Sequence, residues 1–460
     1  MSDSHGGGKG GLPLMGLAGK IAHQSHESGY HLTAKPLIIS YVVLNVLFLF
    51  VDPYQTVHNF ALVSFLAPLW IPYILLYFTF EQWVIYKRSE FISKQDHVLL
   101  ELRMPRDTKK TPLAMEAVFA NLFLTGGEGT WYKRYIQGGV RAWFSFEIVS
   151  IGGRVRFYVW TREGLRRGLE SFFYAQYPEM EIVEAEDYSL LFDPAADGNS
   201  MFGDEFIHTK EDAYPIKTYV EYGLDKAGAK PEEIIDPMAQ LIELLGSVGP
   251  KEQLWIQMII RASKDEKHGH AVKGRTWKDE GKDVVKGIRE TAVKESKAFS
   301  EGEEEGGTKF PTTLSPGQTD VIKAIERNIG KQGFDVGLRS IYTAPSDAYQ
   351  GSMIGFMLNM MRPFSSESLN GFKPSAKFDA RFNDYPWEDK DGHHRQHLHH
   401  QIVDFYRRRA FFHSPYIGEW MVMSTEELAT IYHVPSASVE TPSLPRIGSA
   451  TSGAPSNLPT

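Results

Sequence analysis

The side chains best suited to metal chemistry are five histidines within residues 393–400: His393, His394, His397, His399 and His400. On a helix, imidazoles three or four residues apart lie on one face and can share an ion, which fits His393 with His397 and His397 with His400. No nucleophile accompanies them, and the nearby acids are Asp389 and Asp391. We therefore take His393, His397 and His400 as candidate metal ligands. The alternative is a solvated, charged helix start, and the sequence predicts no cofactor.

Three consecutive arginines, Arg407, Arg408 and Arg409, form a second candidate site, next to Tyr406 and Phe411. Basic side chains mixed with aromatic ones can contact the phosphates of a nucleic acid. Three adjacent residues point to three sides of a helix, so one face gains about one of them. The alternative is that these arginines are solvated or are paired with acids inside the fold.

Composition narrows the remaining chemistry. The 460 residues include no cysteine, which excludes disulfides, zinc–thiolate sites, iron–sulfur clusters and thiol nucleophiles. The net charge of -8 gives no general bias towards nucleic acid. Neither GxxxxGK[ST] nor HExxH occurs, and no Ser-His-Asp spacing is present. The sequence therefore gives no positive signal for an enzyme.

Two apolar runs, 36–51 and 59–80, are joined by a connection without Lys or Arg. A membrane-spanning helix needs roughly 20 apolar residues, a length that the second run meets and the first does not. Lys35 precedes the runs and Lys87 and Arg88 follow them, so the positive-inside rule places both termini in the cytoplasm. We expect a disordered tail at 1–35 and a transmembrane helical hairpin at 36–86. The alternative is a buried helical hairpin in a soluble domain.

Residues 97–188 have the pattern of a ferredoxin-like unit of βαββαβ order. A strand is expected from His97, and Thr111 with Pro112 is a typical N-cap and first helical residue. Two alternating strands follow, joined by a turn at Gly152-Gly153. A helix and a last strand, ending near 188, complete the unit.

A second α+β unit is expected at 214–362. Strands at 215–224 and 252–263 flank an amphipathic helix, and we interpret this order as a degenerate repeat of the first unit. Residues 264–311 are rich in Lys, Glu and Gly and predict a partly helical, largely disordered insertion. The fold resumes at Ser315-Pro316 with a helix, a strand and a Met-rich helix whose methionines we expect to fill the core.

The C-terminal part divides into an irregular and helical region at 363–434 and a Pro/Ser/Gly-rich, linker-like tail at 435–460. Ser424 with Glu427 three residues later predicts a capping box. The expected fold class is therefore α+β, a two-helix transmembrane hairpin followed by two ferredoxin-like units.

Two stretches resemble a known family: ELRMPRDTKKTPLAMEAVFANLFLTGGEGTW with YAQYPEMEIVEAEDY, and YRRRAFFHSPYI with MSTEELATIYHVP. They resemble an uncharacterised bacterial membrane family similar to the membrane and soluble region that precedes type IV secretion ATPases of the conjugative-coupling class. The resemblance covers residues 36–460 and implies no catalytic residues, because that family's chemistry lies in a motor core that is not found in this sequence.

The resemblance implies a protein of the bacterial inner membrane. We expect a non-enzymatic, membrane-anchored assembly component of a type IV secretion or DNA-transfer motor. Its expected partners are the lipid bilayer, a P-loop ATPase from another chain and further copies of itself, with nucleic acid contacted only indirectly. The alternatives are a metal- or ligand-dependent membrane enzyme using the His393–His400 cluster, and a membrane protein that contacts nucleic acid through Arg407–Arg409.

Overall fold

The computed structural model describes residues 67–105, 110–225, 235–264, 276–301, 314–379 and 392–435, with isolated residues between 50 and 65 and at 389 and 444. The chain divides into two compact units, Met1–Trp83 and Val84–Thr460. Helix α4 (Ala67–Ser93) begins in the first unit and ends in the second. Every other helix and strand named below lies within the second unit.

The expected transmembrane hairpin is wrong. Within the residues that the structure describes, no helix is long and apolar enough to cross a membrane. Helix α4, which the structure describes from residue 67 onwards, continues past the second apolar run through Glu81, Lys87 and Glu90, charged groups that are costly in hydrocarbon. The first run lies outside the described residues except for Phe50. The predicted inner-membrane localisation, with both termini cytoplasmic, depended on these two membrane spans. This prediction is therefore wrong as well.

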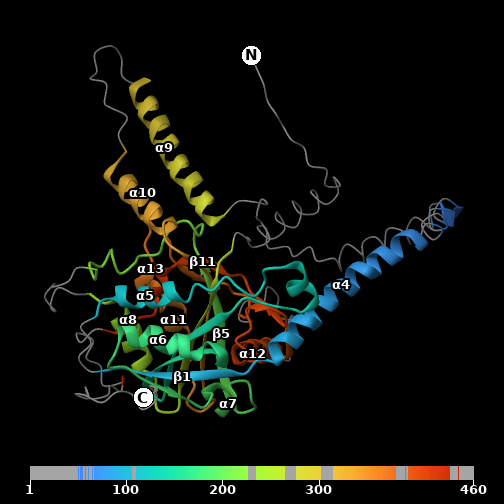
Figure 1. Ribbon diagram of the computed structural model, residues 1–460, viewed down its shortest axis with the longest axis horizontal. Helices are drawn as coiled ribbons and strands as arrows, with labels where there is room; N and C mark the ends of the chain where they lie inside the picture. The colour runs from blue at the N-terminus through green and yellow to red at the C-terminus, as the bar shows by residue number, and fades with distance from the viewer. Residues whose placement is uncertain are drawn as a thin grey trace. The chain divides into compact units, whose positions relative to one another are not determined.

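A nine-stranded antiparallel sheet organises the second unit (Figure 1). Its strands follow the order β4-β1-β3-β2-β6-β7-β5-β8, and β11 pairs with the start of β7. The strands are β1 (His97–Arg103), β2 (Trp143–Ile151), β3 (Arg154–Arg162), β4 (Glu181–Glu184), β5 (Asn199–His208), β6 (Gln253–Ala262), β7 (Gly333–Pro345), β8 (Phe372–Pro374) and β11 (Met421–Ser424). The protein therefore belongs to the α+β class.

The first half of the sheet has the order β4-β1-β3-β2, with α5 (Pro112–Asn121) between β1 and β2 and α6 (Arg166–Gln176) between β3 and β4. This is the connectivity of a split βαβ plan. Helix α5 begins at Pro112 after the N-cap Thr111 and buries Met115 and Phe119. Gly152 and Gly153, with φ of 59° and 80°, form the β2–β3 turn because glycine accepts positive φ without strain.

The second half repeats this connectivity as β5, α8 (Pro237–Gly246), β6, β7, α11 (Ser352–Asn359) and β8, in the sheet order β8-β5-β7-β6. Strand β5 precedes the segment where the sequence predicts the second unit to begin. The strand expected at 215–224 is wrong, since this segment forms turns. The N–H groups of Ile216 and Tyr219 donate to the side chains of Glu427 and Thr430 rather than to a neighbouring strand.

Strands β2 and β6 join the two halves into one sheet, with Glu147 directly opposite Gln257. Continuing outwards, Glu147 pairs with Tyr158 of β3, and Gln257 pairs with Arg339 of β7. Arg339 in turn lies opposite Glu205 of β5. One row of polar residues therefore crosses the centre of a sheet whose other positions are mostly apolar.

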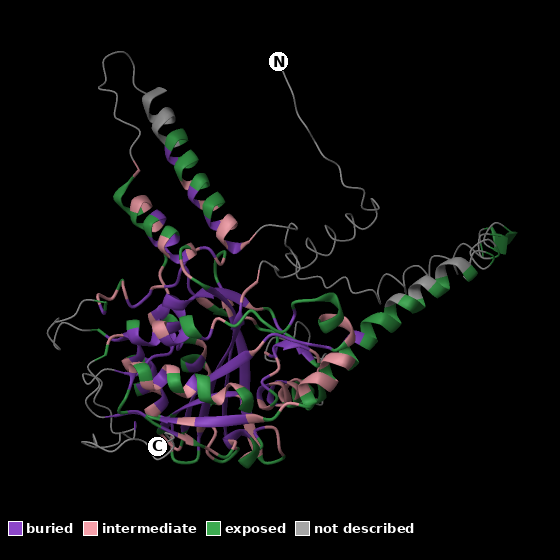
Figure 2. Cartoon of the chain, viewed as in Figure 1, coloured by how far each residue is buried: buried purple, intermediate pink, exposed green. Residues whose placement is uncertain are grey.

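Each face of the sheet is covered by its own group of elements, and most strand residues are buried (Figure 2). Helices α5, α6, α8, α11 and α13 (Thr425–Ile431) contribute to the core on one face. The polar row lies on the other face, under α7 (Tyr188–Leu191), α12 (His393–Arg407) and the hairpin of β9 (Phe412–His413) and β10 (Tyr416–Ile417). Single turns of helix occur at Tyr132–Ile136, Glu163–Leu165 and Arg362–Phe364.

Helices α9 (Trp277–Glu301) and α10 (Pro316–Ile329) lie between β6 and β7 in the sequence. They pack on each other through Val285, Ile322 and Ile325, a small cluster separate from the two sheet cores. The insertion expected to be largely disordered therefore contains a 25-residue helix. Residues 265–275 and 302–313 lie outside the described part of the chain.

Candidate functional site

The histidine segment forms the first two turns of α12, where His393, His397 and His400 are exposed. Within the described residues, no group of three or more His, Asp or Glu side chains is placed to hold a metal ion. Asp389 accepts hydrogen bonds from the backbone N–H groups of His394 and Arg395. This carboxylate therefore satisfies the start of the helix. The contacts fit the interpretation of these residues as a solvated helix start.

The three candidate arginines have three different environments. Arg407 donates to the carbonyl oxygens of Ser189 and Phe192 and lies 3.2 Å from a carboxylate oxygen of Asp193. Arg408 is exposed and pairs with Asp404 one turn earlier, at 2.7 Å. Arg409 is 1% exposed. This low exposure and its pairing with Glu147 and Asp187 favour the alternative for Arg409, an arginine paired with acids inside the fold.

Arg409 is the cation of a buried ionic centre on the polar row. Its Nε and Nη2 lie 3.0 and 3.2 Å from the two carboxylate oxygens of Glu147, and it also pairs with Asp187. Tyr188 donates to Glu147 at 2.7 Å and contacts the hydroxyl of Tyr406. A bidentate pair of this kind is strong because both hydrogen bonds are charge-assisted. The centre ties the segment after α12 to the middle of the sheet.

The polar row continues from this centre towards β5. Gln257 donates to Glu147 at 2.9 Å and accepts from Nε of Arg339 at 2.8 Å. Arg339 also donates to the carbonyl of Ala410 at 2.7 Å. Burial raises the pKa of Glu205, whose carboxylate accepts a hydrogen bond from Tyr416 of β10. Polar side chains on four adjacent strands, three of them charged, are therefore linked to one another and to groups on the segment after α12 and on β10.

A cavity of about 520 Å³ adjoins the ionic centre. Its described lining comes from the end of α4, from β1, β2 and β3, and from residues 407–415. The rings of His97 and Trp160 stack there, with centroids 4.3 Å apart and planes 8° from parallel. Cavities of a few hundred Å³ with aromatic walls are typical of small-molecule sites. This cavity is therefore a candidate binding site in the described part of the chain.

Phe411, one wall of the cavity, is held between two glycines. A Cβ atom added at Gly337 of β7 would lie 2.5 Å from the ring of Phe411, and one added at Gly418 would also lie 2.5 Å from it. Only residues without a side chain leave room for the ring at this distance. The position of the cavity wall therefore depends on these two glycines.

A family model described as a domain of unknown function (DUF8128) matches residues 92–446. The chain belongs to this family. The matched region contains the whole nine-stranded sheet, the ionic centre and α13, whereas nearly all of α4 precedes it. A comparison with curated proteins found no match.

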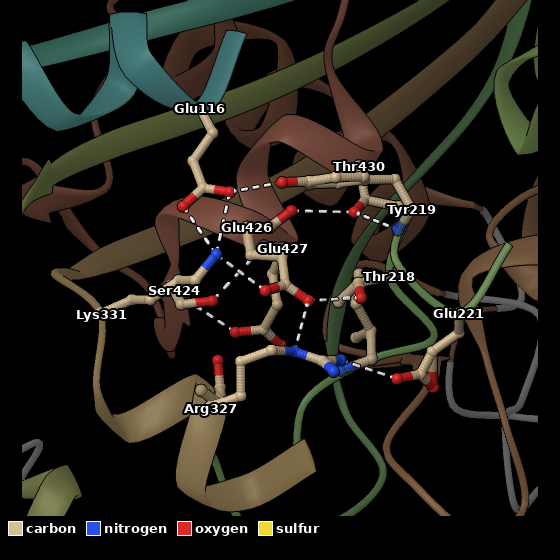
Figure 3. A network of polar contacts seen from close by, with 12 residues as sticks. Glu116, Thr218, Tyr219, Glu221, Arg327, Lys331, Ser424, Glu426, Glu427 and Thr430 are labelled. Carbon is tan, nitrogen blue, oxygen red and sulfur yellow. Dashed lines mark hydrogen bonds and ion pairs between the residues drawn. The ribbon is translucent and has the colours of Figure 1, made fainter. Parts of the chain in front are cut away.

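A second polar network fixes the C-terminal end of the family region (Figure 3). Lys331 lies 2.7 Å from Glu116 of α5 and 2.8 Å from Glu426 of α13. Arg327 of α10 pairs with the same Glu426 at 3.1 Å and with Glu221 at 2.7 Å. Every residue of α13 is buried. We call this group, Glu116, Glu221, Arg327, Lys331 and Glu426, the α13 clamp.

The capping box expected at Ser424 is present and has a second role. Ser424 accepts from the N–H of Glu427, and Glu427 accepts from the N–H of Ser424 at 2.7 Å. The same carboxylate accepts from the N–H of Ile216 at 2.9 Å. The cap therefore also supports the 215–224 segment, which explains why that segment is not a strand.

The sequence analysis did not single out Glu147, the carboxylate of the ionic centre, or His413, which lines the cavity. Glu147 is 0% exposed within a strand that is otherwise largely apolar. A charge in the middle of such a strand is expensive unless it is paired, so its position was a signal for a buried cation elsewhere in the chain. His413 follows two phenylalanines and gives no comparable signal by its spacing.

Proposed function

We propose that the protein is a non-enzymatic assembly component of a secretion or DNA-transfer motor, to which a P-loop ATPase from another chain docks. The observation that carries the proposal is that two halves with the same connectivity form one continuous sheet. Strand β11 pairs with β7 of this sheet, and α13 follows β11 directly. A continuous sheet fixed by buried ion pairs is suited to hold partners at defined positions.

The buried charged side chains support this proposal because they pair with one another. Glu147 and Arg409 pair with each other, and Lys331 and Glu426 pair across the α13 clamp. These groups hold distant segments together, whereas a general acid or base must reach a substrate proton. The resemblance to sequences that precede secretion ATPases supplies the class of partner.

Helix α9 is the element that we assign to docking. Its buried residues Val285 and Ala292 lie on one side, while Lys282, Lys286 and Glu290 are exposed. Charged, exposed positions along one helix can select a partner by electrostatic complementarity.

Affinity purification of the tagged full chain from its native cells, with quantitative mass spectrometry, tests the proposal. We expect a P-loop ATPase to be enriched in near-stoichiometric amount. The variant Lys282→Glu/Lys286→Glu should lower its recovery, because two exposed charges on α9 are reversed. Lys251→Glu is the matched control, since Lys251 is also exposed and pairs only with Asp347 among the described residues, at 2.9 Å. Absence of any P-loop ATPase from the purified material would overturn the proposal.

A further inference from the structure

Four arginine guanidinium groups act electrostatically on His413, which lines the cavity, although none of the four is among its described lining residues. Arg88, Arg141, Arg162 and Arg261 come from α4, the segment before β2, the end of β3 and β6, which are distant in sequence. Burial lowers the pKa of His413 well below its ordinary value, and repulsion from these four guanidinium groups lowers it further. Segments far apart in the chain therefore bring their positive charges to one place.

Only part of this positive charge is compensated by carboxylates. Arg141 lies 3.2 Å from Glu128, and Arg261 lies 2.8 Å from Asp335. Arg162 donates to the carbonyl of Arg141 and its guanidinium lies 4.8 Å from the centre of the Trp143 ring. Burial alone lowers the pKa of Arg162 to about 10. A buried guanidinium without a carboxylate partner is unfavourable unless another anion approaches it.

Several buried hydrogen-bonding atoms near these arginines lack a partner among the described residues. They are Nε of Arg88, Nε of Arg162, Nε2 of His97, Nε1 of Trp143 and both ring nitrogens of His413. Trp143 and His413 line the cavity, although only 6% and 9% of these residues is exposed. Buried polar atoms are almost always bonded in folded proteins, so this concentration of unpaired atoms requires an explanation.

We propose that the end of the cavity at His413 binds the oxyanion of a phosphate or a phosphate ester, with Arg162, Trp143 and His413 as hydrogen-bond donors. One oxyanion carries several acceptor oxygens, so it can satisfy these groups and offset the uncompensated charge at once. Asp187 is the one acid among the described lining residues, and Arg409 pairs with it. Repulsion of the anion by that carboxylate is therefore reduced. This site is independent of the proposed docking through α9.

The aromatic walls extend the inference to the body of the ligand. Trp143, Trp160 and Phe412 line the same cavity, and its volume of about 520 Å³ exceeds what a phosphate group occupies. Planar rings stack favourably on Trp and Phe. A phosphate ester with a planar ring, such as a nucleoside monophosphate, matches both the cationic end and the aromatic walls.

Calorimetric titration of the full chain at low salt, with inorganic phosphate and separately with adenosine monophosphate, tests the site. We expect saturable binding that Arg162→Gln weakens roughly tenfold to a hundredfold, the worth of a charge-assisted hydrogen bond. Trp143→Phe replaces the indole with a smaller aromatic ring, removes the Nε1 donor and should weaken binding several-fold. If adenosine monophosphate binds more tightly than phosphate, the aromatic walls contribute; equal affinities assign the site to the oxyanion alone. Both results support the anion site.

Arg154→Gln is the matched control, because Arg154 is an exposed arginine at the other end of β3. Its affinity for phosphate should equal that of the unaltered protein. Absence of saturable binding of either probe at millimolar concentration would overturn the proposal, as would equal losses for Arg162→Gln and Arg154→Gln. If Arg162→Gln does not fold, Trp143→Phe decides, and a change in the intrinsic tryptophan fluorescence of the unaltered protein on adding the anion provides the second measurement.

Discussion

Arg409 and Glu147 form a bidentate ion pair in the centre of the sheet, between residues that are 1% and 0% exposed. The pair joins the segment after α12 to β2, 262 positions earlier in the chain. Because Glu147 also accepts hydrogen bonds from Ser145, Tyr188 and Gln257, its carboxylate is surrounded by donors. The arrangement makes Arg409 a structural residue.

Arg409→Met should lower the free energy of unfolding by about 3–5 kcal/mol, because it leaves the Glu147 carboxylate buried without its cation. Urea unfolding followed by circular dichroism measures the loss. Arg408→Met is the control, since Arg408 is exposed and its pair with Asp404 is of the kind worth about 0.3–0.5 kcal/mol. Equal losses for the two variants would contradict the assignment of the ionic centre.

Stability should fall as the pH is lowered from 6.5 to 4. Burial lowers the pKa of His97 to about 4, with repulsion from Arg162 and Arg409, and burial also lowers that of His399 to about 4. Because free histidine titrates near 6.5, the unfolded chain takes up protons in this range that the native chain does not. Urea unfolding at several pH values should show this slope. It should be shallower in His97→Gln and unchanged in His393→Gln, which alters an exposed histidine; an unchanged slope in His97→Gln would argue against the effect.

Two glycine-to-alanine substitutions should have opposite effects on thermal stability. At Gly337 the new methyl group would meet the ring of Phe411 at 2.5 Å, and overpacking of this kind costs about 1–3 kcal/mol. At Gly287, inside α9, a Cβ atom would meet nothing within 4 Å. Alanine should therefore stabilise α9 by about 0.5–1 kcal/mol. Scanning calorimetry gives both shifts, and a Gly337→Ala protein as stable as the unaltered chain would show that Phe411 can move aside.

Within the α13 clamp, substitution of the buried Glu426 should lower the free energy of unfolding most. Glu426→Gln weakens the contacts of one carboxylate with Lys331 and Arg327, and we expect a loss of about 1–3 kcal/mol in unfolding free energy. Glu221→Gln breaks a more exposed pair with the same Arg327 and should cost less than about 1 kcal/mol. A double-mutant cycle of Glu426→Gln with Lys331→Met measures the coupling. Coupling indistinguishable from zero would remove the clamp as a stabilising feature.

Local sequence signals predicted several elements well. Thr111-Pro112 marks the start of α5, and Ser315-Pro316 that of α10, which begins with a capping box. The expected core role of the methionines is confirmed, since Met353 and Met357 of α11 are buried. These features depend on residues within a few positions of one another, where backbone geometry and capping act directly. Apolar length, by contrast, gave a wrong prediction at 36–86, because the described helix α4 continues beyond the second apolar run through charged residues.

Sequence alone determined the α+β class, the exclusion of thiol chemistry and the starts of α5 and α10. Tertiary structure decided the pairing of β2 with β6, the burial of Arg409 and the electrostatic influence of Arg88 and Arg162 on His413, which lines the cavity. These relationships join residues that are 102 to 325 positions apart, and their energy comes from burying charges against distant partners. No local pattern carries that information, since an arginine beside a phenylalanine has the same sequence whether its guanidinium is solvated or buried against a distant carboxylate.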